Sequence, residues 1–361
     1  MTQTSIPCVL MRGGTSKGPY FKAEDLPSDP LERDKLLLRI MGSPDLRQID
    51  GLGGGTTVTS KVAIVSESDH PDADIDYLFA QVDLENPIVD TAPTCGNMLS
   101  GVGPFAIEEG LFPASEGETT LKIRNVNTES IIEATVQTPN GQVTYEGDCT
   151  ISGVPRAAAP IPLRFYQISG SKTGKLLPTG NVRDMIDGIE VTCIDVAMPM
   201  VIAQAASLDK TGYETKAELE ADQAFVDRIE VIRRQAGERM GMGDVRDSVI
   251  PKFGIVSAPQ NDGHFASRYF TVYGTCHPAY AVSGSICAST CAALPGSVVS
   301  QITAVDERFP NLSRIEHPSG VIDVTLSLDT ASGQFDVVSG GVLRTARRIF
   351  GGSVYVPAES K

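Results

Sequence analysis

Runs of apolar residues with two different periods divide the first half of the chain into predicted strands and helices. Short β-branched and aromatic runs, typical of strands, lie at residues 6–11, 56–65, 77–82, 120–126, 130–137, 143–145 and 161–168. Apolar positions three and four apart predict a helix at 30–41, which Asp29 can cap and Gly42 ends. Pro139-Asn140-Gly141 predicts a hairpin turn between the strands at 130–137 and 143–145.

The second half of the chain repeats the order of elements seen in the first. Its predicted strands lie at residues 191–206 (interrupted at 198–200), 253–257, 268–272, 322–328, 335–338 and 342–350, and its long helix at 221–240. Strand, helix, strand, a loop of small and polar residues, and helix therefore occur twice. Cys95-Gly96-Asn97 and Ser283-Gly284-Ser285 hold matching places. We expect an internal duplication, with a ligand site between its two halves.

The length and the net charge of the chain limit the classes of protein to which it can belong. A chain of 361 residues is too long for one typical core, so two domains are expected. The net charge of −15 disfavours nucleic acid and anionic membranes as partners. No apolar run is long enough to cross a membrane, and no signal-peptide pattern follows Met1. Seven cysteines without a CxxC pair argue for a reducing compartment, so we expect a cytoplasmic protein.

The stretch from Thr94 to Gly110 predicts a tight loop that opens a helix. Gly96 lets the backbone approach a ligand closely, and Asn97 is a good N-cap. Backbone N–H groups at a helix start form an anion site, and Cys95 beside that site would favour its thiolate form. The alternative is an ordinary core helix in which Cys95 is a small buried apolar residue.

Two further stretches carry candidate chemistry. Residues 12–18 form a Gly-rich loop without the spacing of a nucleotide-binding loop. This loop presents Arg12, Thr15 and Ser16 to a small anion, or it is only a polar turn between strands. Lys61 lies inside the predicted strand at 56–65. A lone lysine there is usually exposed, whereas in a cleft, partial desolvation would favour the neutral amine, a usable base.

Several motifs together resemble the PrpF family of allylic isomerases. The matching segments are Met11–Gly18, Gly42–Asp45, Gln48–Gly51 with its glycine run, Thr59–Val62, Cys95–Met98, Glu316–Gly320 and Leu343–Arg347. The family includes 4-oxalomesaconate tautomerase, 2-methylaconitate isomerase and 3-methylitaconate delta-isomerase. The resemblance covers nearly the whole chain.

The resemblance implies an α+β fold like that of diaminopimelate epimerase. Two pseudo-symmetric domains would each wrap a β-sheet around a central helix, with the active site in the interdomain cleft. We place these domains at residues 1–185 and 186–344, with the tail at about 345–361 packing back on the first. The oligomeric state stays open, with a homodimer among the options.

The resemblance also implies the chemistry. The lysine matched by Lys61 is the proton-transfer residue, and the cysteine matched by Cys95 lies close to it. True epimerases of this fold use two cysteines, but Ser283 stands at the second position here and is a poor acid or base. One base that moves a proton between two carbons of an unsaturated di- or tricarboxylate fits better, with no metal or organic cofactor. The candidate binding residues are Arg12, Thr15, Ser16, Gly96, Asn97, Met98, Arg268, His277, Ser283, Gly284 and Ser285.

Several alternatives remain open from the sequence. The preferred substrate is 4-oxalomesaconate, ahead of 2-methylaconitate and cis- or trans-aconitate. An amino-acid racemase of the same fold is opposed by Ser283, and a non-catalytic accessory protein by the presence of both Lys61 and Cys95. His277 is either a binding residue or a structural histidine near a turn. Cys276, Cys287 and Cys291 are expected to be packing residues.

Overall fold

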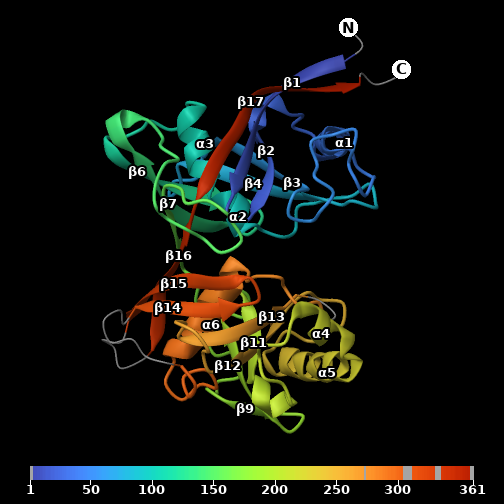
Figure 1. The fold of residues 1–361 in the computed structure, drawn as a ribbon, viewed down its shortest axis with the longest axis vertical. Helices are drawn as coiled ribbons and strands as arrows, with labels where there is room; N and C mark the ends of the chain where they lie inside the picture. The colour runs from blue at the N-terminus through green and yellow to red at the C-terminus, as the bar shows by residue number, and fades with distance from the viewer. Residues whose placement is uncertain (1–2, 272–273, 304–310, 330–334, 358–361) are drawn as a thin grey trace. The chain divides into compact units, whose positions relative to one another are not determined.

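The computed structural model describes residues 3–271, 274–303, 311–329 and 335–357. The chain divides into two compact units (Figure 1): unit 1 comprises Met1–Arg164 and Leu343–Lys361, and unit 2 comprises Phe165–Val342. The domain limits expected from the sequence, at residues 185 and 344, stay predictions. No helix within the described ranges is long and apolar enough to span a membrane.

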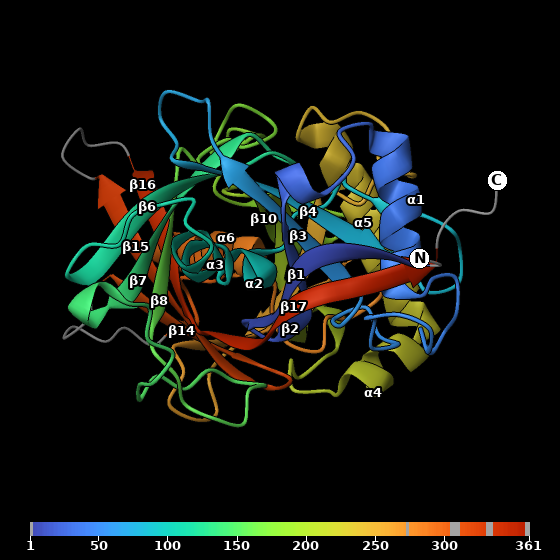
Figure 2. The same ribbon diagram turned by 90° about the horizontal axis from the view of Figure 1, so that it is seen from above.

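Unit 1 is a β-sheet curved around two short helices. Its elements are β1 (Gln3–Gly13), β2 (Ser16–Lys22), α1 (Pro30–Met41), β3 (Lys61–Glu67), β4 (Ile75–Val82), β5 (Val89–Asp90), α2 (Gly96–Leu99), α3 (Val102–Glu108), β6 (Gly117–Asn125), β7 (Ser130–Thr138) and β17 (Ala346–Pro357). Helices α2 and α3 pack against β3, with α2 also touching β1 and β2 and α3 touching β7 (Figure 2). β8 (Ile161–Tyr166) and β16 (Asp336–Arg344) carry the chain between the units.

Unit 2 has the same kind of organisation. Its elements are β9 (Asp184–Ile186), β10 (Ile189–Asp195), β11 (Pro199–Gln204), α4 (Lys216–Ala221), α5 (Gln223–Arg239), β12 (Lys252–Ser257), β13 (Phe265–Phe270), α6 (Val282–Ala293), β14 (Leu312–His317) and β15 (Gly320–Asp329). Helix α6 packs against β10, β11, β14 and β15, whereas α5 packs against β9 and β12.

The strand pairings confirm the internal duplication. In unit 1, β1 pairs antiparallel with β2, β2 parallel with β3, β3 antiparallel with β4, β4 parallel with β6, and β6 antiparallel with β7. In unit 2, strands β10 to β15 follow the same sequence of antiparallel and parallel pairings. Helix α1 corresponds to α4 and α5, and helices α2 and α3 correspond to α6. Each parallel step needs a crossover connection, and the helices supply it.

Helix α1 forms where the sequence predicts it. The Asp29 side chain accepts a hydrogen bond from the Glu32 N–H, Pro30 takes the first position, and Gly42 ends the helix in the left-handed conformation, with φ of 77°. The buried face of α1 includes Leu37 and Ile40, which pack in one cluster with apolar residues of β3 and β4. These local signals need no help from distant parts of the chain.

Three expectations about the elements are wrong. Residues 56–60 do not extend a strand, because Thr59 N–H bonds to the Thr56 carbonyl and makes a turn, so that β3 begins at Lys61. Residues 143–145 form no strand: residues 139–141 make a single 3-10 turn, and β7 pairs with β6 instead. The predicted strand at 342–350 is divided at Thr345 between β16 and β17.

Strand β17 joins the two ends of unit 1. It lies antiparallel to β1 along its whole length (Figure 1), from Gln3 opposite Pro357 to Gly13 opposite Ala346. β1 is therefore a central strand between β2 and β17. This pairing brings Thr345 and the end of β16 next to the turn between β1 and β2.

Candidate active site

The Gly-rich loop at 12–18 is a tight hairpin turn that contacts α2. Gly13 lies opposite Ser16 in the β1–β2 ladder. A Cβ atom on Gly14 would lie 2.2 Å from Asn97 Oδ1, and Gly14 has φ of 51°. Glycine is required here for both reasons. The Asn97 side-chain amide in turn donates to Thr15 Oγ1 at 3.1 Å, so the turn and the start of α2 hold each other in place.

Helix α2 is shorter than the sequence predicts and begins one residue after Cys95. Cys95 occupies the N-cap position with φ of −137° and makes no side-chain capping bond, while Asn97 lies inside the helix. The expectation that Asn97 caps a helix is therefore wrong. α2 ends at Leu99, and a second short helix, α3, follows from Val102. A four-residue helix has only a small dipole, because the dipole grows with the number of aligned peptides.

Two buried tyrosines fix the backbone around Cys95, and no sequence pattern pointed to either of them. Tyr77 donates its hydroxyl to the Cys95 carbonyl at 3.2 Å. Tyr20 donates to the Met98 carbonyl at 2.5 Å. Burial raises the pKa of both phenols well above the ordinary value, so both stay protonated donors. Met98 itself is fully buried and serves to pack α2.

Lys61 is held by an amide and an aromatic ring. It is the first residue of β3 and lies opposite Gln81 of β4. Lys61 Nζ donates to Gln81 Oε1 at 2.6 Å and lies 5.0 Å from the centre of the Phe79 ring. The Gln81 amide nitrogen donates to the carbonyl of Ser60 at 2.7 Å, which fixes the orientation of its oxygen. Among the described residues no carboxylate forms an ion pair with Lys61.

Strand β4 connects Lys61 with Cys95. Phe79 contacts Lys61, and Tyr77, two residues earlier on the same face of β4, binds the Cys95 carbonyl. Same-face positions two apart on a strand are separated by roughly 7 Å. Gly18 adds a second link, because a Cβ on it would lie 1.8 Å from the Lys61 carbonyl oxygen and 3.2 Å from Met98 Cε. The two candidate proton-transfer residues therefore belong to one packed region of unit 1.

Ser16 is buried and Arg12 is half-buried in the same turn. Arg12 donates to the carbonyls of Gly14 at 2.8 Å and Thr345 at 2.9 Å. Burial, followed by the charge of Arg347, lowers the Arg12 pKa. The Ser16 hydroxyl is buried and has no hydrogen-bond partner among the residues that the structure describes. Arg12 thus supports the turn, while Ser16 has an unused donor and acceptor.

In unit 2, the predicted binding residue Arg268 is buried in β13. It donates to the carbonyls of Glu214 and Ser267, each at 3.1 Å, and lies 5.6 Å from the Tyr213 ring. Burial lowers the Arg268 pKa. No carboxylate forms an ion pair with it in the part of the chain that the structure describes.

Ser283, Gly284 and Ser285 all lie in the first turn of α6, after Ala281 at the N-cap. The Ser285 hydroxyl is buried and donates to the Val282 carbonyl at 2.8 Å, so its hydrogen is already used. Gly284 packs against Tyr269, and a Cβ there would lie 2.4 Å from the ring. Ser283 is half-buried.

The position of His277 agrees with the structural interpretation. Its Nδ1 accepts a hydrogen bond from the Ala279 N–H at 3.0 Å, and its ring meets Tyr269 edge-on at 6.1 Å between centres. Cys276, Cys287 and Cys291 are buried, which confirms them as packing residues. Burial raises the pKa of Cys276 to about 11 and that of Cys291 to about 12, so these thiols stay protonated.

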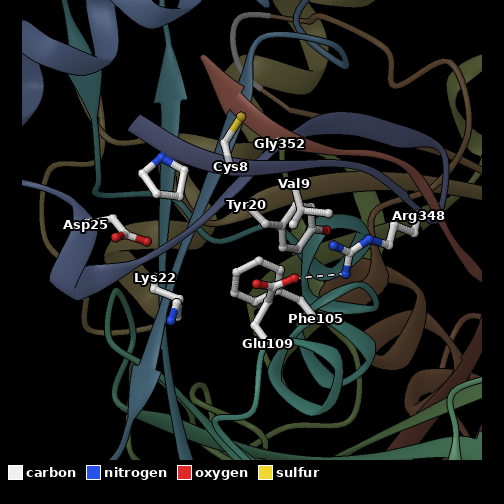
Figure 3. A pocket seen from close by; sticks show the side chains of 10 residues that line it. Cys8, Val9, Tyr20, Lys22, Asp25, Phe105, Glu109, Arg348 and Gly352 are labelled. Carbon is white, nitrogen blue, oxygen red and sulfur yellow. Dashed lines mark ion pairs between the residues drawn. The ribbon is translucent and has the colours of Figure 1, made fainter. Parts of the chain in front are cut away.

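A separate small pocket of unit 1 adjoins Tyr20 but contains none of the predicted site residues (Figure 3). Its volume is about 80 Å³, and its charged lining residues are Lys22, Asp25, Glu109 and Arg348. Arg348 pairs with Glu109 at 2.9 Å, and Lys22 pairs with Glu24 at 3.0 Å. These cations are already neutralised within the protein.

The chain matches the family model described as PrpF protein over residues 3–357. It is 53% identical over 352 residues to "Putative isomerase YbhH" of Escherichia coli strain K12, with 98% of this chain and 99% of that protein covered. It is 47% identical over 357 residues to the 4-oxalomesaconate tautomerase of Pseudomonas putida, with 99% and 97% covered.

Solved structures show the same fold. The crystal structure of a methylitaconate-delta-isomerase matches with a TM-score of 0.88 and 38% identity, covering 99% of this chain and 97% of that one. A hydroxyproline epimerase from Agrobacterium vitis matches at 0.57 with 11% identity, covering 100% of this chain and 94% of that one, a likeness of fold alone. These matches confirm the expected α+β, two-domain, epimerase-like fold.

Proposed function

The chain belongs to the PrpF protein family and is an isomerase, and on this premise we propose that it moves a proton across the allylic system of a small unsaturated di- or tricarboxylate. The proposed substrate is 4-oxalomesaconate, because the Pseudomonas putida relative that bears this substrate in its name is 47% identical over almost the whole chain. The structural neighbour named for methylitaconate is 38% identical, so methylitaconate is the second candidate.

The proposed reaction uses one base. Lys61, as a neutral amine, takes a proton from the carbon next to a carboxylate or keto group, and the electrons of that C–H bond form a dienolate. The same nitrogen then returns a proton at the far end of the allylic system, and the double bond moves by one position. The transfer consumes no electron acceptor and leaves Lys61 as it began.

The observation that carries this proposal is the environment of Lys61. Within the described part of the chain, the polar partner of Lys61 Nζ is the neutral amide of Gln81, and the Phe79 ring covers one side. A carboxylate partner would hold the lysine in its charged form, whereas an amide oxygen adds no negative charge. Cys95 lies in the same packed region and is the second candidate proton-transfer group, either as an acid or only in contact with the substrate.

The negative charge of the dienolate needs hydrogen-bond donors. We propose that Thr15, Ser16, Asn97 and the Gly96 N–H supply them in unit 1, together with Arg12. Among these, the Ser16 hydroxyl is the clearest unused group, because it is buried without a partner. The residues suggested in unit 2, namely Arg268, His277, Ser283, Gly284 and Ser285, stay predictions.

Proton NMR in deuterated water tests the proposal. Wild type, Lys61→Ala and the control Lys122→Ala, an exposed lysine of β6, are each incubated with 4-oxalomesaconate, methylitaconate, 2-methylaconitate and cis- and trans-aconitate. We expect deuterium uptake and double-bond movement in one substrate for wild type and the control, and neither for Lys61→Ala. Full activity in Lys61→Ala would exclude this lysine as the base and favour Cys95. No reaction with any of the compounds would remove the support for allylic chemistry.

A further inference from the structure

Arg344 is a buried cation whose charge is balanced by no acidic side chain of the described residues. It is the last residue of β16, and only 8% of its surface is exposed. Its terminal nitrogen donates to the carbonyl of its own neighbour Leu343 at 3.0 Å, and its Nε has no hydrogen-bond partner in the described ranges. No carboxylate pairs with it among the described residues. A buried guanidinium without a counter-ion is costly, so an anion is expected to occupy this place when the protein works.

One of the groups that act electrostatically on Arg344, Cys95, belongs to the candidate site. The guanidinium charge acts on the thiols of Cys95 and Cys149, while burial lowers the Arg344 pKa to about 10. The guanidinium therefore lies within electrostatic range of Cys95 with its planar donor edge partly unused.

The residues next to Arg344 add a second, independent sign of a missing ligand. Thr345 follows it directly, and the Thr345 carbonyl is held by Arg12 and by the Gly14 N–H at the β1–β2 turn. In the part of the chain that the structure describes, the buried Thr345 hydroxyl has no partner, and neither has the Ser16 hydroxyl on the adjoining turn. Native proteins rarely leave several neighbouring buried polar atoms unpaired.

We propose that Arg344 binds a carboxylate group of the substrate beside Cys95. A guanidinium matches a carboxylate with two parallel hydrogen bonds, which places the substrate as well as holding it. The inference rests on the proposed function, since it assigns the substrate's carboxylate to a named cation of that site. The sequence motif Leu343–Arg347 contained this residue, but nothing in the motif separated Arg344 from the exposed Arg347.

The experiment uses tricarballylate, a saturated tricarboxylate that has no double bond to move. Alkylation of Cys95 by iodoacetamide is followed by mass spectrometry in wild type, Arg344→Lys, Arg344→Gln and the control Arg348→Gln. Arg348 lies on β17 and is paired with Glu108 and Glu109. We expect tricarballylate to protect Cys95 in wild type and in the control. In Arg344→Gln the concentration for half protection rises on the order of 100-fold, with a smaller rise in Arg344→Lys.

Two results would overturn the assignment. One is an unchanged half-protection concentration in both Arg344 variants, even if the alkylation rate without ligand changes, because Arg344 would then act on the thiol and not on the ligand. The other is no protection of the wild type at any concentration. If Arg344→Gln does not fold, Arg344→Lys, which keeps the charge, decides the question, with circular dichroism as the check on folding.

Steady-state kinetics of wild type and Arg344→Gln distinguishes a failure of this inference from a failure of the proposed function. If wild type moves a proton in one of the five substrates, KM should rise in Arg344→Gln more than kcat falls. Activity with an unchanged KM would contradict the role of Arg344 alone. If no substrate reacts but the Arg344 variants still weaken the protection of Cys95 by tricarballylate, the proposed allylic reaction is wrong and the carboxylate site is supported.

Discussion

Lys61 and Lys252 begin corresponding strands of the two units. Each is the first residue of the third strand of the repeated series, β3 in β1–β7 and β12 in β10–β15, and each strand pairs parallel with the strand before it and antiparallel with the strand after it. Lys61 donates to the Gln81 side chain, whereas Lys252 donates to the Thr271 carbonyl at 3.1 Å. Lys252 is more deeply buried, and burial lowers its pKa to about 8.

The burial of Lys252 predicts that Lys252→Met stabilises the protein at neutral pH. Below pH 8 the lysine is charged in the folded and unfolded states, so the folded state bears the full desolvation cost, about 3 kcal/mol. Losing the hydrogen bond to Thr271 offsets about 1–2 kcal/mol of the gain. We expect the free energy of unfolding in urea at pH 7 to rise by about 1–2 kcal/mol.

The pH dependence of the same variant checks the cause. The folded state releases the Lys252 proton at lower pH than the unfolded state, so wild-type stability recovers as pH rises from about 8 to the ordinary lysine value of 10.5. The advantage of Lys252→Met should therefore shrink over that window and change sign before its upper end, where the variant is less stable than wild type by the lost hydrogen bond, about 1–2 kcal/mol. An advantage that stays constant with pH would mean that packing, not charge, is responsible.

Gln81→Glu should shift the pH dependence of catalysis. A carboxylate at 2.6 Å in place of the amide oxygen favours the protonated Lys61, so the neutral amine becomes scarcer at any given pH. We expect exchange at neutral pH to fall about tenfold and the rising limb of the pH–rate profile to move upward by about one unit. Gln142→Glu, an exposed position with the same change of charge, serves as the control. An unshifted profile would remove Lys61 from the proton transfer.

Transfer of the proton by a single lysine predicts partial retention of the substrate's own hydrogen. After abstraction in deuterated water the ammonium carries one substrate proton and two deuterons, so up to about a third of first-turnover products keep the original hydrogen at the new position. Mass spectrometry of products at low conversion measures this fraction. Cys95→Ala should leave it unchanged. Complete deuteration from the first turnover in wild type would show that a second group, with Cys95 the nearest candidate, delivers the proton.

Gly14→Ala should disrupt the site far more than Gly110→Ala. Both glycines have positive φ, 51° and 75°, so each substitution carries a backbone penalty of about 1 kcal/mol. Only the Cβ at residue 14 collides with a neighbour, Asn97 Oδ1, while nothing lies within 4 Å of a Cβ at residue 110. We expect Gly14→Ala to lower the deuterium-exchange rate at least about tenfold and Gly110→Ala to leave it within twofold of wild type. Equal effects in the two variants would argue against a role for the Gly14–Asn97 contact.

Local signals account for the elements that the sequence predicted well. Helix α1 has its cap, its first-turn proline and its terminal glycine within fourteen consecutive residues, and all three act as expected. The duplication was visible because its order of strands and helices is a property of the chain itself. Lys61 and Cys95 were candidates from the sequence itself, the resemblance to a family assigned them roles, and the structure then added the contacts that join them.

The remaining features depend on partners far away in the sequence. Tyr20 and Met98, or Tyr77 and Cys95, meet only after the sheet has formed, and a tyrosine in a strand looks the same whether or not its hydroxyl binds a catalytic loop. Residues 143–145 have the composition of a strand, yet β7 already pairs with β6, and Pro139 interrupts the chain at its end. Arg344 is indistinguishable from Arg347 until burial is known.

The pairing of β17 with β1 determines the order in which the two units can be completed during synthesis. All of unit 2 is translated before residues 346–357 exist, so its contiguous strands are free to pair first. Until then β1 has one unpaired edge, on the side that β17 later covers. Arg12 and Gly14 also lack the Thr345 carbonyl that accepts their hydrogen bonds. The candidate site of unit 1 is therefore the last part of the chain to be completed, and a nascent chain that stops short of β17 carries a finished second unit but no working first one.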